Sequence, residues 1–358
     1  MKKSLIALAV LASAAGAASA QSSVTLFGIV DATVAYGRAS GGANKYQLTN
    51  SGYNSSRLGF RGVEDLGGGM SASFWLEAGL SNDNGTGVGT NLNNQAAGAS
   101  GGATGLVFNR RSTVSLAGGW GELRLGRDYT PQFWNLTVFD PFGTNGVGTT
   151  QTLNSIVTGV TAVRASNTVG YFLPGNLGGF YGQAQYYFGE NVRNGAATEK
   201  DGTGAGVRVG FANGPFNVAV ALSETKYAAG KVKQNNLGGQ WDFGIAKAMA
   251  HYSWDENGAV EGKGWLVGGL FPVGAGEIRA AVSRYKIDNV AGADPRATKV
   301  ALGYVHNLSK RTAVYTTWAR LKNANGGAPA AALNGATYGA GAVNPTSTGL
   351  DLGIRHSF

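Results

Sequence analysis

The sequence has no cysteine, few prolines and few charged residues. Proline occurs 8 times, and charged residues make up 14% of the 358 positions. Without cysteine, neither a disulfide framework nor a cysteine nucleophile is available. No segment after residue 20 offers the ~20 apolar residues that a membrane-spanning helix needs. Any crossing of a membrane must therefore use strands.

Motifs for catalysis and for cofactors are also scarce. Only three histidines occur, His251, His306 and His356, and no second histidine stands at metal-ligand spacing from any of them. The glycine-rich stretches lack the Lys-Ser or Lys-Thr that completes a phosphate-binding loop. The sequence thus predicts neither an enzyme nor a metal or cofactor site.

The N-terminus has the pattern of a secretory signal peptide. Lys2 and Lys3 precede an apolar run, and Ala18-Ser19-Ala20 is a small-residue cleavage site. We expect a signal peptide over residues 1–20 and a single mature barrel domain over residues 21–358. The net charge of +9 would fall to +7 after cleavage, since 27 basic and 20 acidic residues remain. The basic residues are scattered rather than clustered, which argues against nucleic acid as a partner.

The C-terminal stretch Thr348 to Phe358 alternates strictly. Leu350, Leu352, Ile354 and Phe358 share one face, and polar or small residues such as Asp351 hold the other. Such a strand could be the edge of a soluble sandwich, which would have to be covered. In a closed barrel in lipid, the apolar face points outward and the polar face lines water.

Strand signals of this kind recur along the whole chain. They are joined by seven tight turns and eight longer connections, an asymmetry typical of outer-membrane barrels. The sequence predicts an all-β fold, a sixteen-stranded antiparallel transmembrane β-barrel, with a soluble multi-sheet protein as the alternative. Aromatic residues expected near the strand ends, where membrane girdles would lie, are Tyr186, Tyr187, Phe188, Trp241, Trp254, Phe271, Tyr304 and Trp318.

Several stretches resemble one family, the general diffusion porins of Gram-negative outer membranes, most closely the type of Neisseria and Burkholderia relatives. The matching stretches are residues 24–31 (VTLFGIVD), 56–67 (SRLGFRGVEDLG), 110–116 (RRSTVSL), 126–129 (GRDY), 303–312 (GYVHNLSKRT) and 353–358 (GIRHSF). They cover the mature chain in order. The resemblance implies a homotrimer in the cell outer membrane, whose terminal Phe358 is an assembly signal read by the barrel-insertion machinery.

The connection from Tyr129 to Ala165 is far longer than ordinary loops. The resemblance implies that this third loop folds inward and forms a pore constriction opposite a ladder of arginines. The residues expected at the constriction are Arg57, Arg61, Arg110, Arg111, Arg164 and Asp140. Between Pro141 and Ala165 the chain has no acidic residue, so the facing acidic wall is reduced to Asp140 and Asp128. Rings of basic side chains favour anions.

The predicted function is a water-filled channel for passive diffusion of small hydrophilic solutes and ions, with anions preferred. Two alternatives remain open at this point. A substrate-specific channel would need an aromatic or polar track along the lumen. A structural or adhesin barrel would act through its loops instead.

Overall fold

A computed structural model describes residues 23–95, 105–157, 159, 161–288 and 292–358. The predicted signal peptide lies outside these residues. Eighteen strands and a few short helices make up the described chain. The strands are β1 (Ser23–Ala39), β2 (Lys45–Asn50), β3 (Arg57–Gly67), β4 (Met70–Ser81), β5 (Thr86–Gly87), β6 (Arg111–Gly118), β7 (Gly121–Tyr129), β8 (Arg164–Phe172), β9 (Phe180–Tyr187), β10 (Gly204–Asn213), β11 (Phe216–Thr225), β12 (Val232–Asp242), β13 (Lys247–Asn257), β14 (Val260–Val273), β15 (Gly276–Asp288), β16 (Arg296–Asn307), β17 (Thr312–Ala324) and β18 (Thr346–Ser357). The helices are α2 (Pro131–Val138), η2 (Gln151–Asn154), η3 (Ala197–Lys200) and η4 (Leu333–Gly335).

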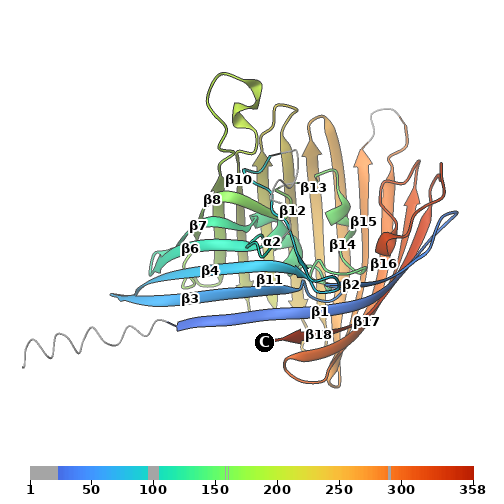
Figure 1. Cartoon of the computed structure of the whole chain (residues 1–358), viewed down its shortest axis with the longest axis horizontal. Coiled ribbons are helices and arrows are strands. Elements are labelled where there is room, and N and C mark those ends of the chain that lie inside the picture. Colours follow the sequence, from blue (N-terminus) through green and yellow to red (C-terminus); the bar gives the residue numbers. More distant parts are fainter. Residues whose placement is uncertain (1–22, 96–104, 158, 160, 289–291) are drawn as a thin grey trace, which may run out of the picture.

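The strands form one closed antiparallel ring. Each strand of the wall pairs with the next wall strand along the chain, and β1 closes the ring by pairing with β18, from Ile29 opposite Ser357 to Ala39 opposite Ser347. The short strands β2 and β5 lie within the connections β1–β3 and β4–β6, which leaves sixteen of the eighteen strands around the wall. Figure 1 shows the blue β1 beside the red β18. The predicted sixteen-stranded barrel is confirmed.

Alternation along each strand gives the wall two different faces. On β18, Leu350 and Leu352 are 41% and 58% exposed, whereas Asp351 between them is 2% exposed. A soluble protein would place the leucines inside. Around the ring, large apolar residues are exposed on the outward face, and polar residues such as Asp351 face inward, as expected of a barrel in lipid.

The connections follow the predicted asymmetry with one difference. Seven short turns lie at one end of the ring, and most of the connections at the other end are longer. One of the eight longer connections is predicted at residues 255–263, but Gly258 and Ala259 alone separate β13 from β14. The strands continue past the predicted ends because their residues pair directly across, as Glu256 does with Glu261.

The predicted aromatic girdle needs one correction. Most of its members are exposed on the outer face, including Trp241 at 45% and Phe271 at 44%. Tyr187, however, is completely buried, and its hydroxyl lies 2.6 Å from Oγ1 of Thr225. Its position in the alternation directs it inward, whereas the neighbouring Tyr186 and Phe188 point outward. No helix in the described ranges is long and apolar enough to cross a membrane.

Candidate functional site

A cavity of about 1080 Å³ lies between the connection that follows β7 and the inner face of the wall, mainly that of strands β3 to β9, with Arg208 of β10, Met249 of β13 and Arg279 of β15 also at its border. Its lining is rich in arginine and poor in acidic residues. Seven arginines contribute, Arg57, Arg110, Arg111, Arg124, Arg164, Arg208 and Arg279, against the three carboxylates of Glu77, Asp128 and Asp140. The formal charge of the lining is therefore +7 − 3, or +4.

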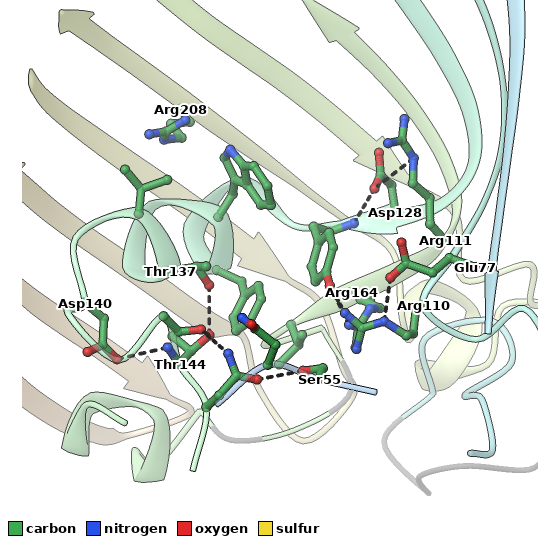
Figure 2. A pocket seen from close by; sticks show the side chains of 18 of the residues that line it. Ser55, Glu77, Arg110, Arg111, Asp128, Thr137, Asp140, Thr144, Arg164 and Arg208 are labelled. Carbon is green, nitrogen blue, oxygen red and sulfur yellow. Dashed lines mark hydrogen bonds and ion pairs between the residues drawn. The ribbon is translucent and has the colours of Figure 1, made fainter. Parts of the chain in front are cut away.

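Three arginines, from β3, β8 and the residue just before β6, converge on one carboxylate and one tyrosine. Arg110 places Nε 2.5 Å from Oε1 of Glu77, and Arg57 approaches the same oxygen at 3.5 Å. Both Arg110 and Arg164 donate to the hydroxyl of Tyr129, at 2.6 and 2.9 Å. Figure 2 shows Arg110 and Arg164 directed toward this point. One carboxylate among three guanidinium groups leaves an excess of positive charge.

A second group lies further along β6 and β7. Arg124 donates from Nη1 to Asp128 at 2.6 Å and contacts Glu122 at 2.9 Å. Nε of Arg111 lies 3.7 Å from the other oxygen of Asp128. These two arginines are thus closely balanced by acids, in contrast to the group around Glu77.

Aromatic rings hold several of the guanidinium groups in place. Arg124 lies 3.9 Å from the centre of the Phe172 ring, and Arg164 lies 4.4 Å from that of Tyr129. Arg279 lies 4.4 Å from the ring centre of Tyr53. Stacking of this kind stabilises a cation and restricts its motion. The arginine heads are consequently positioned before any solute arrives.

The connection from β7 to β8 is anchored first through helix α2. Pro131 stands at the helix start, where its missing N–H costs nothing. Asn135 donates from Nδ2 to Oδ1 of Asn236 at 2.7 Å, and Arg208 donates to Oδ1 of Asn135 at 2.8 Å. Because Arg208 and Asn236 lie on β10 and β12, the helix contacts the inner face well away from its own strands.

A tight turn centred on Asp140 follows the helix. The carboxylate accepts backbone N–H groups from Phe142 at 2.9 Å, Thr144 at 3.2 Å and Thr150 at 3.0 Å. Asp140 is only 3% exposed. Burial raises its pKa, while these N–H groups and the nearby Lys299 oppose the shift. In Figure 2 its carboxylate turns toward Thr144. Asp140 therefore holds the backbone of the connection.

The rest of the connection bonds to strands on the other side of the ring. Val147 donates its N–H to Oδ2 of Asp351 on β18 at 2.9 Å, and Gln151 donates to Oγ of Ser283 on β15 at 2.9 Å. Phe142 and Val147 pack in one apolar cluster with inward residues of β14 to β17. The chain returns to β8 through a bond from Thr130 N to Val163 O at 3.1 Å.

The structure brings four of the predicted arginines together, Arg57, Arg110, Arg111 and Arg164. Two predicted residues lie differently. Arg61 shares the inward face of β3 but lies nearer the short turns, with its guanidinium 5.4 Å from the ring centre of Phe27 and 5.2 Å from that of Trp75, outside the cavity lining. Asp140 borders the cavity, but its carboxylate is engaged by the backbone.

Sequence reasoning missed Glu77, Arg124, Arg208 and Arg279. A usable signal existed for Arg208, which is 6% exposed between Val207 and Val209 at 38% and 48%. A lone arginine between two outward valines must face inward. Arg124 between Leu123 and Leu125 has the same pattern. Among the described residues, no group of three histidines or carboxylates could hold a metal ion.

The terminal residue lies on the seam of the ring. Phe358 donates its N–H to Gly28 O at 3.1 Å, and Gly28 donates back to Phe358 O at 3.1 Å. The Phe358 ring lies over Gly28, where an added Cβ would come within 2.4 Å of its Cζ. Only glycine at this position leaves room for the ring.

Comparison with known proteins identifies close relatives. The sequence pattern of a family described as Gram-negative porin matches residues 7–326. An outer membrane porin protein of Delftia acidovorans is 40% identical over 373 residues, covering 100% of both chains. An outer membrane porin protein of Bordetella pertussis is 30% identical over 417 residues, again covering 100% of both. The solved structure of an anion-selective porin from Comamonas acidovorans, 36% identical, matches with a TM-score of 0.80 over 94% of this chain and 100% of its own.

Proposed function

The chain belongs to the Gram-negative porin family and forms a channel of the outer membrane for passive diffusion, and we propose that its cavity prefers anions among the small hydrophilic solutes that it passes. The observation that carries this preference is the lining of seven arginines against three carboxylates. A solved relative with 36% identity is titled an anion-selective porin, which supports the same assignment.

The group of Arg57, Arg110 and Arg164 is the part of the lining with the largest excess of positive charge. Among the described acids, Glu77 is the one that contacts these arginines, whereas the carboxylate of Asp140 accepts N–H groups of its own turn. Basic side chains around a narrow aqueous path attract anions and repel cations. The anion preference therefore originates at this group.

The connection between β7 and β8 is the element that narrows the path. Its bonds to Asn236, Ser283 and Asp351 support an inward fold, since these residues lie on inner faces of strands far from β7. A sixteen-stranded barrel without an internal obstruction would leave a wide aqueous channel. With this connection in place, the path runs past the arginines of β3 to β8.

A channel with a defined organic anion as substrate is the second candidate. The arginine and aromatic pairs of the cavity favour it, because a solute with an anionic group and a flat apolar part would contact both. Current that saturates with the concentration of such a solute would distinguish this candidate from simple diffusion.

Two further parts of the proposal concern assembly. Family membership supports a homotrimer in the membrane, and the bonds of Phe358 to Gly28 support its role in closing the ring during insertion. Residues 1–20 would act as the export signal.

Single-channel recording in planar bilayers tests the anion preference. In a gradient of potassium chloride near 0.1 M, the zero-current potential should have the sign of a chloride-permeable channel. At 1 M salt the Debye length falls from about 10 Å to about 3 Å, so the preference should largely vanish. A cation preference at 0.1 M would contradict the assignment.

A further inference from the structure

A second basic group lies on the outer face of the barrel, away from the cavity. Arg284 on β15, Arg296 on β16, and Arg320 and Lys322 on β17 border a groove of about 470 Å³ together with Thr298 and Trp318. The pairing of the strands brings them together. Thr298 lies directly opposite Arg284 on one side and Lys322 on the other, and Arg320 lies opposite Val300.

The alternation along β16 and β17 places this group outside. Val300, Leu302 and Trp318 share its face and are 44%, 53% and 40% exposed. The residues between them, Lys299, Ala301 and Ala319, are at most 3% exposed and face the interior. The four cations therefore cannot contribute to the lining of the channel.

The position of the four cations along the barrel axis is also defined. They lie where β15, β16 and β17 meet the connections of residues 289–295 and 325–345, at the end with the longer connections, which faces the outside of the cell in barrels of this kind. The apolar Val300 and Leu302 follow toward the membrane centre. Such an order, cations above an aromatic and apolar band, matches the boundary between lipid headgroups and acyl chains.

The four cations lack acidic partners within the part of the chain that the structure describes. The nearby carboxylates, Asp288 and Asp294, pair with Lys263 and Lys286 at 2.6 to 3.0 Å. Among the ion pairs of the described ranges, Arg284, Arg296, Arg320 and Lys322 take part in none. Within the group, Nε of Arg284 donates to Oγ1 of Thr298 at 3.1 Å. Like charges on neighbouring strands repel one another, which destabilises the folded barrel. An anion bound between the four cations would offset this repulsion.

We infer that this group, here called the outer basic groove (Arg284, Arg296, Thr298, Trp318, Arg320 and Lys322), binds the phosphate groups of a lipid in the outer leaflet. Four unpaired cations fit a headgroup with two phosphates, because each phosphate carries close to two negative charges. Guanidinium groups bind phosphate oxygens in pairs, and Trp318 would contact the adjoining acyl chains.

Lipid retention by the purified, detergent-solubilised protein tests this inference. The protein is incubated in mixed micelles with a bis-phosphorylated glycolipid, with the same lipid after enzymatic dephosphorylation, or with inorganic phosphate, and bound lipid is measured after gel filtration. The test variant is R320Q/K322Q. The matched control is K231Q/K233Q, which removes two cations from the same rim at the start of β12, five strands from β17, where both are paired with glutamates.

The wild type should retain the phosphorylated lipid, and R320Q/K322Q should bind it about 25-fold more weakly, at about fivefold for each cation near a charged membrane surface. The control should bind as the wild type does. Unchanged conductance and circular dichroism of the variant would show that it folds. Equal retention by wild type and R320Q/K322Q, equal retention of the dephosphorylated lipid, or binding of inorganic phosphate as tight as that of the lipid would each overturn the inference. So would a changed oligomeric state of the variant, which would mark this face as a contact between copies.

Discussion

The two halves of the barrel wall differ sharply on their inner faces. Strands β3 to β8 present Arg57, Glu77, Arg110 and other charged residues to an open cavity. Strands β14 to β17 present mainly small or apolar residues, among them Leu266, Ala281, Ala301, Ala319 and Leu321, all at most 6% exposed, with a few polar ones such as Ser283 and Lys299 between them. Against this second half pack Phe142 and Val147 of the connection between β7 and β8.

Apolar residues cover most of the outer face of both halves, the outer basic groove apart. The difference between the halves lies in their inward residues. Small side chains let the connection approach the wall and bury its apolar residues, which stabilises it there by the hydrophobic effect. A long charged side chain loses hydration under such packing, and the buried Lys299 of β16 lies there with the carboxylates of Asp140 and Asp351 nearby. The type of inward residue therefore decides which side of the interior is filled and which side stays open to water.

Weakening the junction of β18 with β1, which closes the ring, should have the largest effect, because it acts on folding itself. Deletion of Phe358 removes two backbone hydrogen bonds to Gly28 where β18 meets β1, and unpaired backbone groups cost several kcal/mol each in lipid. We expect a severalfold lower yield of heat-modifiable folded protein in outer membranes, measured by gel shift. Phe358→Tyr, which keeps the ring and the backbone, is the control. Normal insertion of the deletion variant would contradict the assembly role.

Destabilising the turn at Asp140, in the connection that packs against β14 to β17, should have the next largest effect, which is on conductance. Asp140→Ala removes the acceptor of three backbone N–H groups in the turn, and each buried donor left unpaired costs about 1–3 kcal/mol. The connection should move away from its packed position, so single-channel conductance should rise and become noisier.

The control for this variant is Asp201→Ala, which removes a carboxylate that accepts a backbone N–H from Ala228 in an exposed connection. Its conductance should match that of the wild type. If Asp140→Ala also conducts as the wild type does, the turn does not hold the narrow part of the path.

Neutralising the charged half should change selectivity while leaving the fold intact. In R57S/R164S the cavity loses two of its seven arginines. A unit charge about 5 Å from an ion contributes about 0.8 kcal/mol in water, so the ratio of chloride to potassium permeability should fall severalfold. The measurement is the zero-current potential at 0.1 M salt, with K231Q/K233Q as the charge-matched control. An unchanged potential would remove these arginines from the proposed selectivity site.

The smallest expected effect is an increase in anion preference, opposite to the decrease expected for R57S/R164S. Glu77→Gln removes the one carboxylate that contacts Arg57 and Arg110 and keeps an oxygen that can accept their hydrogen bonds. Anion preference should increase by about half the magnitude seen in R57S/R164S, since one charge is changed. Glu256→Gln, which removes an outward glutamate paired with Lys233, should have no effect. A decrease in anion preference would show that Glu77 acts by positioning the arginines.

Much of the fold could be predicted because the two faces of a strand are encoded in neighbouring residues. The alternation of Leu350, Asp351 and Leu352 indicates the outward face without any other information, and repetition of that pattern gives the number of strands. The resemblance added Arg57, Arg110 and Arg164, which the structure brings together. Their role at the constriction stays a prediction.

The sequence by itself thus determined the strands, their two faces and the charge that the interior would carry. Only the tertiary structure decided which charged groups meet. Tyr53 and Arg279 are 226 residues apart and bond at 3.0 Å, and the carboxylate of Asp140 points into its own turn while Glu77, on another strand, contacts the arginines. Closure of the ring and packing of the long connection set these distances, and no local periodicity carries information about either.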